Sequence, residues 1–113
     1  MVEDCIFCKI VAGDIPSEMV YEDDDIVAFK DANPAAPTHL LVIPREHIVD
    51  LDDADQEHAE LLGRLNLVAQ EVAADAGLDS FRLVQNNGAG AGQSVFHIHY
   101  HVLGGRDLSW PPG

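Results

Sequence analysis

Three of the six histidines in this chain occupy alternate positions in a short apolar segment: His97, His99 and His101. Side chains of a β-strand point to opposite faces with a period of two residues, so a strand here would place all three imidazoles on one face. The intervening Ile98 and Tyr100 are residue types that favour strands. Because imidazole acts as a nucleophile, a proton shuttle or a metal ligand near neutral pH, this segment is the candidate reactive centre.

A glycine-rich loop, residues 86–94, leads directly into the histidines and has the sequence NNGAGAGQS. Loops of small residues expose backbone N–H groups that bind anions. A plain connection between two strands would explain the glycines, but it would not explain the hydroxyl of Ser94 just before the histidines. The loop and the histidines together predict a phosphate group held against a row of imidazoles.

The chain length and charge limit the classes of function. The 113 residues suffice for a single domain, 1–113, and no apolar run is long enough to span a membrane. With 6 basic and 20 acidic residues, the formal net charge of −14 argues against binding to nucleic acid or to an anionic membrane. An anionic ligand must therefore be bound by local donors. The acidity fits either a high-salt cytoplasm or an ordinary acidic protein.

The two cysteines, Cys5 and Cys8, lie only three residues apart. They cannot join distant segments by a disulfide, and no secretory leader is evident, so we expect a reduced, cytoplasmic setting. A Cys-x-x-Cys pair binds zinc when two further ligands complete the tetrahedron, and the candidates are His47 and His97, with His58 a weaker third. The alternatives are two buried thiols without metal, or a redox pair that lacks the thioredoxin-type βαβ setting.

The order of the expected elements predicts an α+β fold. An antiparallel sheet of about five strands would be covered by one long helix, with a short N-terminal helix beside it. The short helix would run from Cys5 to about Val11, capped by Asp4 and ended by Gly13. The expected strands are 18–21, 26–29, 39–43, 81–85 and 95–103. The long helix would begin after a cap at Asp52 or Asp53, end near Ala76 and be followed by Gly77.

The pattern His-φ-His-φ-His-φ-φ at residues 97–103 resembles the signature of the histidine triad (HIT) superfamily. Other segments are similar to those of its Hint branch, the nucleoside phosphoramidate hydrolases: Asp31, the Ala-Pro-Thr-His turn at 36–39 with its apolar strand, the Gly-Gln-Ser loop at 92–94 and the terminal Trp-Pro-Pro-Gly at 110–113. The resemblance covers residues 3–113. It implies a HIT-like fold that pairs with a second copy as a homodimer.

The same resemblance implies a purine nucleotide (AMP-type) ligand and a hydrolase that works through a nucleotidyl-histidine intermediate on His99. His101 would donate to a phosphate oxygen or protonate the leaving amine, and His39 would orient the row. Asp31 would accept hydrogen bonds from the ribose hydroxyls. The donors implied for the α-phosphate are Asn86, Gly92 and Ser94, with His99 and His101.

The resemblance also extends to the cysteines and to the apolar residues. Relatives such as the galactose-1-phosphate uridylyltransferases join a cysteine pair to an upstream histidine and to the first histidine of the motif. For this chain the implied ligands of a structural zinc are Cys5, Cys8, His47 and His97. Core packing is the default interpretation of the apolar residues, and the resemblance alone implies a base pocket formed by Ile6, Phe7, Ile15, Phe29 and Ile43. Trp110 would reach across a dimer interface.

Two other classes of function remain open from the residues alone. A metal-dependent hydrolase could use His97 and His99, with His39 or His101, as a three-histidine zinc site. A nucleotide-binding interaction module would bind the ligand without chemistry. The ordered set of Hint-like segments favours the phosphoramidate hydrolase. Neither the leaving group nor the base preference follows from the residues, because an apolar pocket discriminates weakly between bases.

Overall fold

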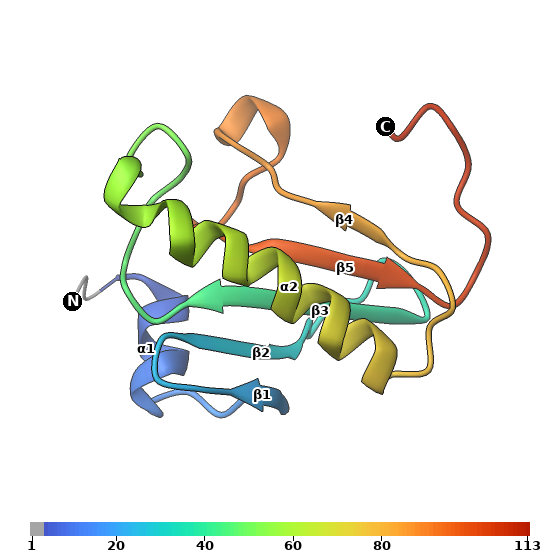
Figure 1. The fold of residues 1–113 in the computed structure, drawn as a ribbon, viewed down its shortest axis with the longest axis horizontal. Coiled ribbons are helices and arrows are strands. Elements are labelled where there is room, and N and C mark those ends of the chain that lie inside the picture. Colours follow the sequence, from blue (N-terminus) through green and yellow to red (C-terminus); the bar gives the residue numbers. More distant parts are fainter. Residues whose placement is uncertain (1–3) are drawn as a thin grey trace.

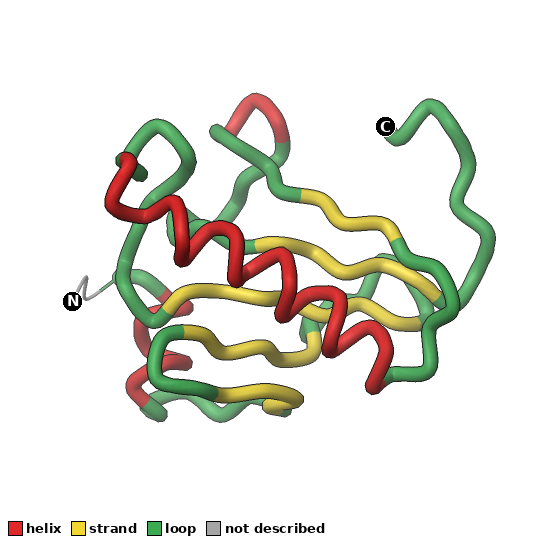
Figure 2. Tube along the Cα trace, viewed as in Figure 1, coloured by secondary structure: helices red, strands yellow, loops and turns green. Residues whose placement is uncertain are grey.

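The computed structural model describes residues 4–113 and arranges its strands in one antiparallel sheet of five (Figures 1 and 2). The strands are β1 (Met19–Glu22), β2 (Ile26–Lys30), β3 (Thr38–Pro44), β4 (Arg82–Val84) and β5 (Tyr100–Gly104). Their order across the sheet is β1-β2-β3-β5-β4. With two α-helices added, this confirms the predicted α+β class. Within the described range, no helix is both long and apolar enough to cross a bilayer.

The long helix α2 (Ala59–Asp75) lies across one face of the sheet (Figure 1). The apolar spacing that predicts this helix also predicts its buried side, since Leu65, Val68 and Val72 are buried and Leu61 packs beside them. Alternate residues of each strand meet this side, because strand side chains have a period of two. The strand residues on this face are Ile26, Ala28, Leu40, Val42 and Val102.

The short helix α1 (Ile6–Ala12) packs on the opposite face, against β2 and β3. Its buried residues contact the other alternate set of strand side chains, which comprises Val27, Phe29, Leu41 and Ile43. His39 shares this face because it lies two residues before Leu41. His101 pairs directly with Leu41 across β3 and β5, so it lies on the same face as well. The sheet therefore presents its histidines on the side that carries α1.

The start of each helix differs from the prediction. Cys5, not Asp4, caps α1: its extended backbone lets the thiol accept the N–H of Cys8 at 3.3 Å. Gly13 ends this helix with φ 81°, as predicted, because a left-handed residue is favourable for glycine. The predicted end of α2 is also confirmed, with Ala76 as its cap and Gly77 at φ 81°.

The predicted caps Asp52 and Asp53 are wrong for α2. A 3₁₀ turn (Gln56–His58) precedes the helix, and its cap is Asp55, whose carboxylate accepts the N–H of Glu57 at 2.9 Å. Asp53 instead accepts the N–H of Val49. The carboxylate of Asp52 accepts a hydrogen bond from the side-chain amide of Asn87, in the glycine-rich loop, at 3.2 Å. These carboxylates organise the loop before the turn, so the helix begins later than expected.

The predicted strand at 95–103 begins only at Tyr100. Tyr100 pairs with Val42, and continuing the register would set Ile98 opposite Pro44. Proline has no N–H to donate to a ladder, so the pairing ends before that point. The N–H of Ile98 donates instead to the carbonyl of Ile48 at 2.6 Å. His97 and His99 therefore lie in an irregular segment just before β5.

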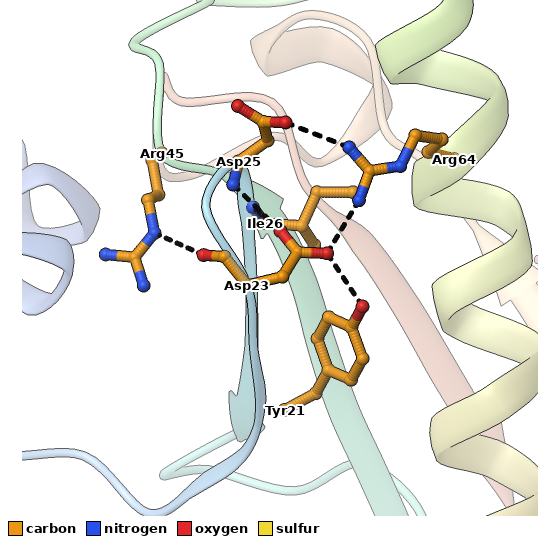
Figure 3. A network of polar contacts seen from close by, with 6 residues as sticks. All are labelled: Tyr21, Asp23, Asp25, Ile26, Arg45 and Arg64. Carbon is orange, nitrogen blue, oxygen red and sulfur yellow. Dashed lines mark hydrogen bonds and ion pairs between the residues drawn. The ribbon is translucent and has the colours of Figure 1, made fainter.

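The turn between β1 and β2 is tied to α2 by Asp23 (Figure 3). One carboxylate oxygen accepts the N–H groups of Asp25 and Ile26, both at 2.8 Å. The other accepts the Tyr21 hydroxyl at 2.7 Å and the Arg64 guanidinium at 2.6 Å. Burial raises the pKa of Asp23, but these hydrogen bonds and the positive charge of Arg64 outweigh it and lower the pKa overall. The ionised carboxylate thus holds the edge hairpin against the helix.

Replacing Asp23 with alanine is expected to reduce the free energy of unfolding by about 2 kcal/mol, because a hydrogen bond to a charged group contributes roughly 1.5–3 kcal/mol. Urea unfolding measures the change. Asp24→Ala is the matched control, since Asp24 is the adjacent exposed carboxylate of the same turn. An equal loss in both variants would contradict a specific role for the Asp23 contacts.

Candidate active site and metal centre

The predicted row of histidines is present on the α1 side of the sheet. The rings of His99 and His101 have centroids 4.9 Å apart, and those of His39 and His101 are 5.1 Å apart. Phe7 of α1 meets His97 and His99 edge-on, at 6.0 and 5.0 Å. The three histidines of the motif therefore lie on one face, although only His101 is part of a strand. The expected alternation holds for the side chains even where the ladder has ended.

The backbone fixes the tautomer of His99. Its Nδ1 lies 2.8 Å from the carbonyl oxygen of His97, and a carbonyl only accepts, so Nδ1 carries the proton. In a neutral imidazole the other nitrogen, Nε2, then holds the lone pair. The ring is 5% exposed, and burial lowers the pKa of His99, so the neutral form is favoured. His99 thus offers an unprotonated, oriented nitrogen.

A chain of hydrogen bonds fixes the tautomers of the neighbouring His39 and His101 in the same way. The N–H of Ala35 donates to Nδ1 of His39 at 2.9 Å, so the proton of a neutral His39 resides on Nε2. That Nε2–H donates to Nδ1 of His101 at 2.8 Å. The remaining proton of His101 is therefore on Nε2, where it can serve as a donor. One unprotonated nitrogen and one N–H donor thus stand side by side on His99 and His101.

Burial lowers the pKa of His101 from 6.5 to about 4, with the neighbouring His99 and His39 acting in the same direction. Between these two pH values the unfolded chain binds a proton at His101 that the folded chain does not. Stability therefore falls as the pH falls from about 6.5 towards 4. Above that range the ring is neutral, and its contribution to the free energy of unfolding is fully present.

Replacing His101 with asparagine is expected to flatten this pH dependence. Relative to the variant, the wild-type chain should lose about 2 kcal/mol between pH 7 and pH 4.5, because a pKa shift of one unit corresponds to about 1.4 kcal/mol and the ring is partly exposed. Urea unfolding of both proteins at several pH values provides the comparison. Parallel stability curves would contradict a depressed pKa at His101.

A cavity of about 590 Å³ opens beside the histidines. Its polar lining includes four predicted site residues, Asp31, Ser94, His99 and His101. Its apolar wall comprises Ile6, Phe7, Ile10, Ile15, Phe29 and Leu41. Of the five residues implied for a base pocket, Ile43 alone is absent from this lining: it is fully buried in the core beneath α1.

Asp31 serves the loop and the site at once. One carboxylate oxygen accepts the N–H of Asn33 at 2.8 Å, which is the loop-capping contact that Asp commonly makes before Asn-Pro. The other lies 3.3 Å from Nε2 of His39. The loop contact confirms the local interpretation of this residue, and the carboxylate is also held at the cavity wall, beside His39.

The glycine loop is only partly brought to the cavity. Ser94 lines it, whereas Asn86 and Gly92 lie next to each other outside the lining residues. The buried Gln93 shapes the loop: its side chain accepts the N–H of Gly88 and donates to the carbonyls of Val49 and Val95. Sequence reasoning overlooked Gln93, although an amide between a glycine run and an apolar segment is a usable signal for such a clamp.

The predicted zinc ligands converge in space. One ligand atom each from Cys5, Cys8, His47 and His97 lies within 4.8 Å of all the others. Cys8 Sγ is 3.3 Å from His47 Nδ1, and His97 Nδ1 is 3.4 and 3.6 Å from the two sulfurs. Tetrahedral bonds of about 2.3 Å to sulfur and about 2.0 Å to nitrogen would separate such atoms by about 3.5 Å. The set therefore has the dimensions of a zinc site.

The protonation state of His97 is suited to binding a metal ion. Its Nε2 lies 2.7 Å from the carbonyl of Pro44 and must donate, which leaves the lone pair on Nδ1, facing the two sulfurs. Burial lowers the pKa of His97 to about 4. His58, the weaker candidate, is elsewhere: its ring bonds to Glu46 at 2.9 Å and to the N–H of Asp55.

A catalytic metal site fits the structure less well. Asp31, His39 and His101 do form a second group of possible ligand atoms. However, the nitrogen of His39 that faces this group is Nε2, which carries the proton because Nδ1 accepts the N–H of Ala35. A metal ligand needs a lone pair at that position. The arrangement is thus suited to a hydrogen-bond relay.

The sequence of this chain is similar to those of known proteins. A family model, the HIT domain, matches residues 12–108. An uncharacterized HIT-like protein of Synechocystis sp. is 58% identical over 100% of both chains. A 14 kDa zinc-binding protein of Zea mays is 50% identical, over 96% of this chain and 87% of its own.

Solved structures show the same fold. The HIT family hydrolase from Legionella pneumophila Philadelphia 1 superimposes with a TM-score of 0.94 at 48% identity, over 97% of this chain and 100% of that one. The HIT family hydrolase from Clostridium thermocellum Cth-393 gives a TM-score of 0.93 at 45% identity, over 96% of each chain. With this likeness in sequence and fold, and with the histidine motif assembled on one face, the chain belongs to the HIT family.

Proposed function

We propose that the chain is a Hint-type hydrolase of purine nucleoside phosphoramidates, which cleaves the P–N bond at the α-phosphate and releases AMP. The observation that carries the proposal is the hydrogen bond from Nδ1 of His99 to the carbonyl of His97, at 2.8 Å. It leaves Nε2 as the nitrogen with a free lone pair, on a ring that lines the cavity. Membership of the HIT family and the two neighbours named hydrolases support the proposal.

The proposed reaction has two steps. Nε2 of His99 attacks the α-phosphorus while the N–H of His101 donates a hydrogen bond to a phosphate oxygen, and the departing amine takes up a proton from solvent. Water then attacks the nucleotidyl-histidine, gives up a proton to solvent and frees AMP and neutral His99. The covalent intermediate divides one difficult displacement into two easier ones. A positioned N–H donor stabilises the charge that develops on the phosphate oxygens.

The cavity offers a place for each part of the nucleotide. Asp31 would accept hydrogen bonds from the ribose hydroxyls, and Ser94 would donate to the α-phosphate. Asn86 and Gly92 would reach the phosphate only after a shift of the loop, because they lie outside the present lining. The apolar wall beneath α1 would receive the purine ring.

Zinc is the proposed metal for the cluster of Cys5, Cys8, His47 and His97, and the name of the Zea mays relative supports this choice. When bound, it would supply structural cross-linking and not Lewis-acid catalysis, because all four positions are taken by protein ligands. We further propose a cytoplasmic homodimer. Trp110, at 81% exposed, and Leu67, at 71%, are large apolar side chains that a second copy could cover.

The test is AMP release from adenosine 5′-phosphoramidate by purified protein, with and without a chelator that has removed the metal. Release that persists immediately after gentle metal removal would assign the chemistry to the histidines. Release that stops at once while the chain stays folded would assign it to the metal and overturn the proposal. Tight AMP binding with no release from any phosphoramidate would instead indicate a nucleotide-binding module.

A further inference from the structure

One residue belongs to both centres of this protein. The side chain of His97 faces the two cysteine sulfurs at 3.4 and 3.6 Å, and its carbonyl accepts the proton of His99 Nδ1 at 2.8 Å. His97 is fully buried, and Nε2 donates to the carbonyl of Pro44. His97 therefore contributes to both centres, with its imidazole at the thiols and its backbone carbonyl at the proposed nucleophile.

The two thiols are placed for a reaction with each other. Their sulfurs lie within 4.8 Å of each other, and Sγ of Cys5 accepts a hydrogen bond from the N–H of Cys8 in the first turn of α1. Cys5 and Cys8 are the only cysteines among the 113 residues, so no other internal disulfide can form. A disulfide between them would close only a short loop and leave the rest of the backbone in place.

Small reactants have a route to this pair. A second cavity, of about 250 Å³, is lined by Cys5 and His47, together with Asp4, Val49 and Phe96. Ser94 lines this cavity and also the cavity of about 590 Å³ beside the histidines, so it lies between the two. A small oxidant can therefore reach the pair through Cys5, whereas Cys8 is not among the lining residues.

We infer that Cys5 and Cys8 form a peroxide-sensitive switch, in which their oxidation to a disulfide releases His97 and inactivates the histidine centre. The inference rests on the proposed function, since it treats His99 as the nucleophile. In the reaction, two thiols and one hydrogen peroxide give one S–S bond and two molecules of water. The two electrons pass from the sulfurs to the peroxide O–O bond, which breaks.

Oxidation would act by reducing the number of metal ligands in the cluster. A disulfide sulfur is no longer a thiolate ligand, so the cluster would fall from four ligands to His47 and His97 alone. His97 would lose its partners on Nδ1 and keep only the side-chain hydrogen bond from Nε2 to Pro44, so the residue whose carbonyl orients His99 would be held by fewer contacts. Disturbing a group that orients a reacting side chain typically costs about 10–100-fold in activity or in metal affinity.

The experiment uses the full chain loaded with one equivalent of zinc and titrated with hydrogen peroxide. Intact mass is expected to show the loss of two hydrogen atoms, and a chromogenic chelator should detect free zinc at the same peroxide concentration. AMP release from adenosine 5′-phosphoramidate should fall by about 10–100-fold in parallel. Dithiothreitol with added zinc should reverse all three changes, and the NMR signal of the His99 Nδ1 proton should disappear and return with them.

Two variants sharpen the result. Cys8→His keeps a donor atom at this position but cannot form the disulfide, so it should retain its zinc under peroxide. Met19→Leu removes the only methionine beyond the initiator, which excludes methionine oxidation as the cause. If Cys8→His does not fold, the wild-type chain still decides: a disulfide that forms with zinc retained, or with AMP release unchanged, would overturn the switch. Absence of AMP release before oxidation would refute the proposed function alone, because mass, zinc and NMR still report on the thiols.

Discussion

Replacing His99 with alanine is expected to abolish release of AMP from adenosine 5′-phosphoramidate while nucleotide binding survives. The loss should reach roughly 10⁴-fold or more, because removal of a covalent nucleophile eliminates the stepwise route. Binding should be retained because Asp31, Ser94 and the apolar wall of the cavity are untouched. Steady-state kinetics and calorimetric titration with AMP measure the two quantities separately.

The control for this substitution is His58→Ala. His58 lies outside the cavity, and its ring contacts Glu46 and the backbone of Asp55. This variant should keep its turnover even if its stability drops. Because His99 packs on Phe7, a thermal melt of His99→Ala must show that the variant is folded at the assay temperature. Turnover within tenfold of wild type in a folded variant would refute the covalent mechanism.

Zinc removal is expected to have the largest effect on stability. A ligand that binds only the folded state stabilises it by about 4 kcal/mol when present at 1,000 times its dissociation constant. For a domain of this size the melting temperature should therefore fall by roughly 15 °C on metal removal. The cluster ties α1 to the segment before β5, so these two parts should lose protection first. Thermal melts at graded zinc concentrations measure the effect.

Cys8→Ala should abolish the response of the melting temperature to zinc. His58→Ala again serves as the control, because this histidine is not among the clustered ligands and its variant should respond like the wild-type chain. A melting temperature that does not change with zinc in the wild-type chain would show that the four residues are packed thiols and imidazoles only. An equal response in Cys8→Ala would place the metal elsewhere.

Much of the fold follows from local patterns. The alternation of apolar residues predicts the strands, and the spacing of Leu65, Val68 and Val72 predicts the buried side of α2. The starts of the helices were missed because several aspartates precede α2 and each is a suitable cap. Only tertiary contacts, such as the one between Asp52 and Asn87, decide which of them is free to cap. The extent of the domain stays a prediction.

The candidate site, too, follows in part from the sequence and in part from contacts that only the folded chain makes. Spacing alone places His97, His99 and His101 on one face, and this is confirmed. The late start of β5 was missed because it depends on Pro44 being opposite Ile98, which is a property of register between distant segments. The tautomers also depend on backbone partners, namely the N–H of Ala35 and the carbonyls of His97 and Pro44, whose positions are set by the folded backbone and not by residue types.

The two tasks of His97 have different chemical requirements, which bears on how this position can vary. Its carbonyl is common to every amino acid, whereas the lone pair of Nδ1 that faces Cys5 and Cys8 belongs to histidine alone. Position 97 is therefore constrained by epistasis with the cysteine pair more than by the proposed reaction itself. In a background without the two thiols, loss of the Nδ1 lone pair at this position should cost less than it does in the wild-type chain, while positions 99 and 101 remain intolerant in either background.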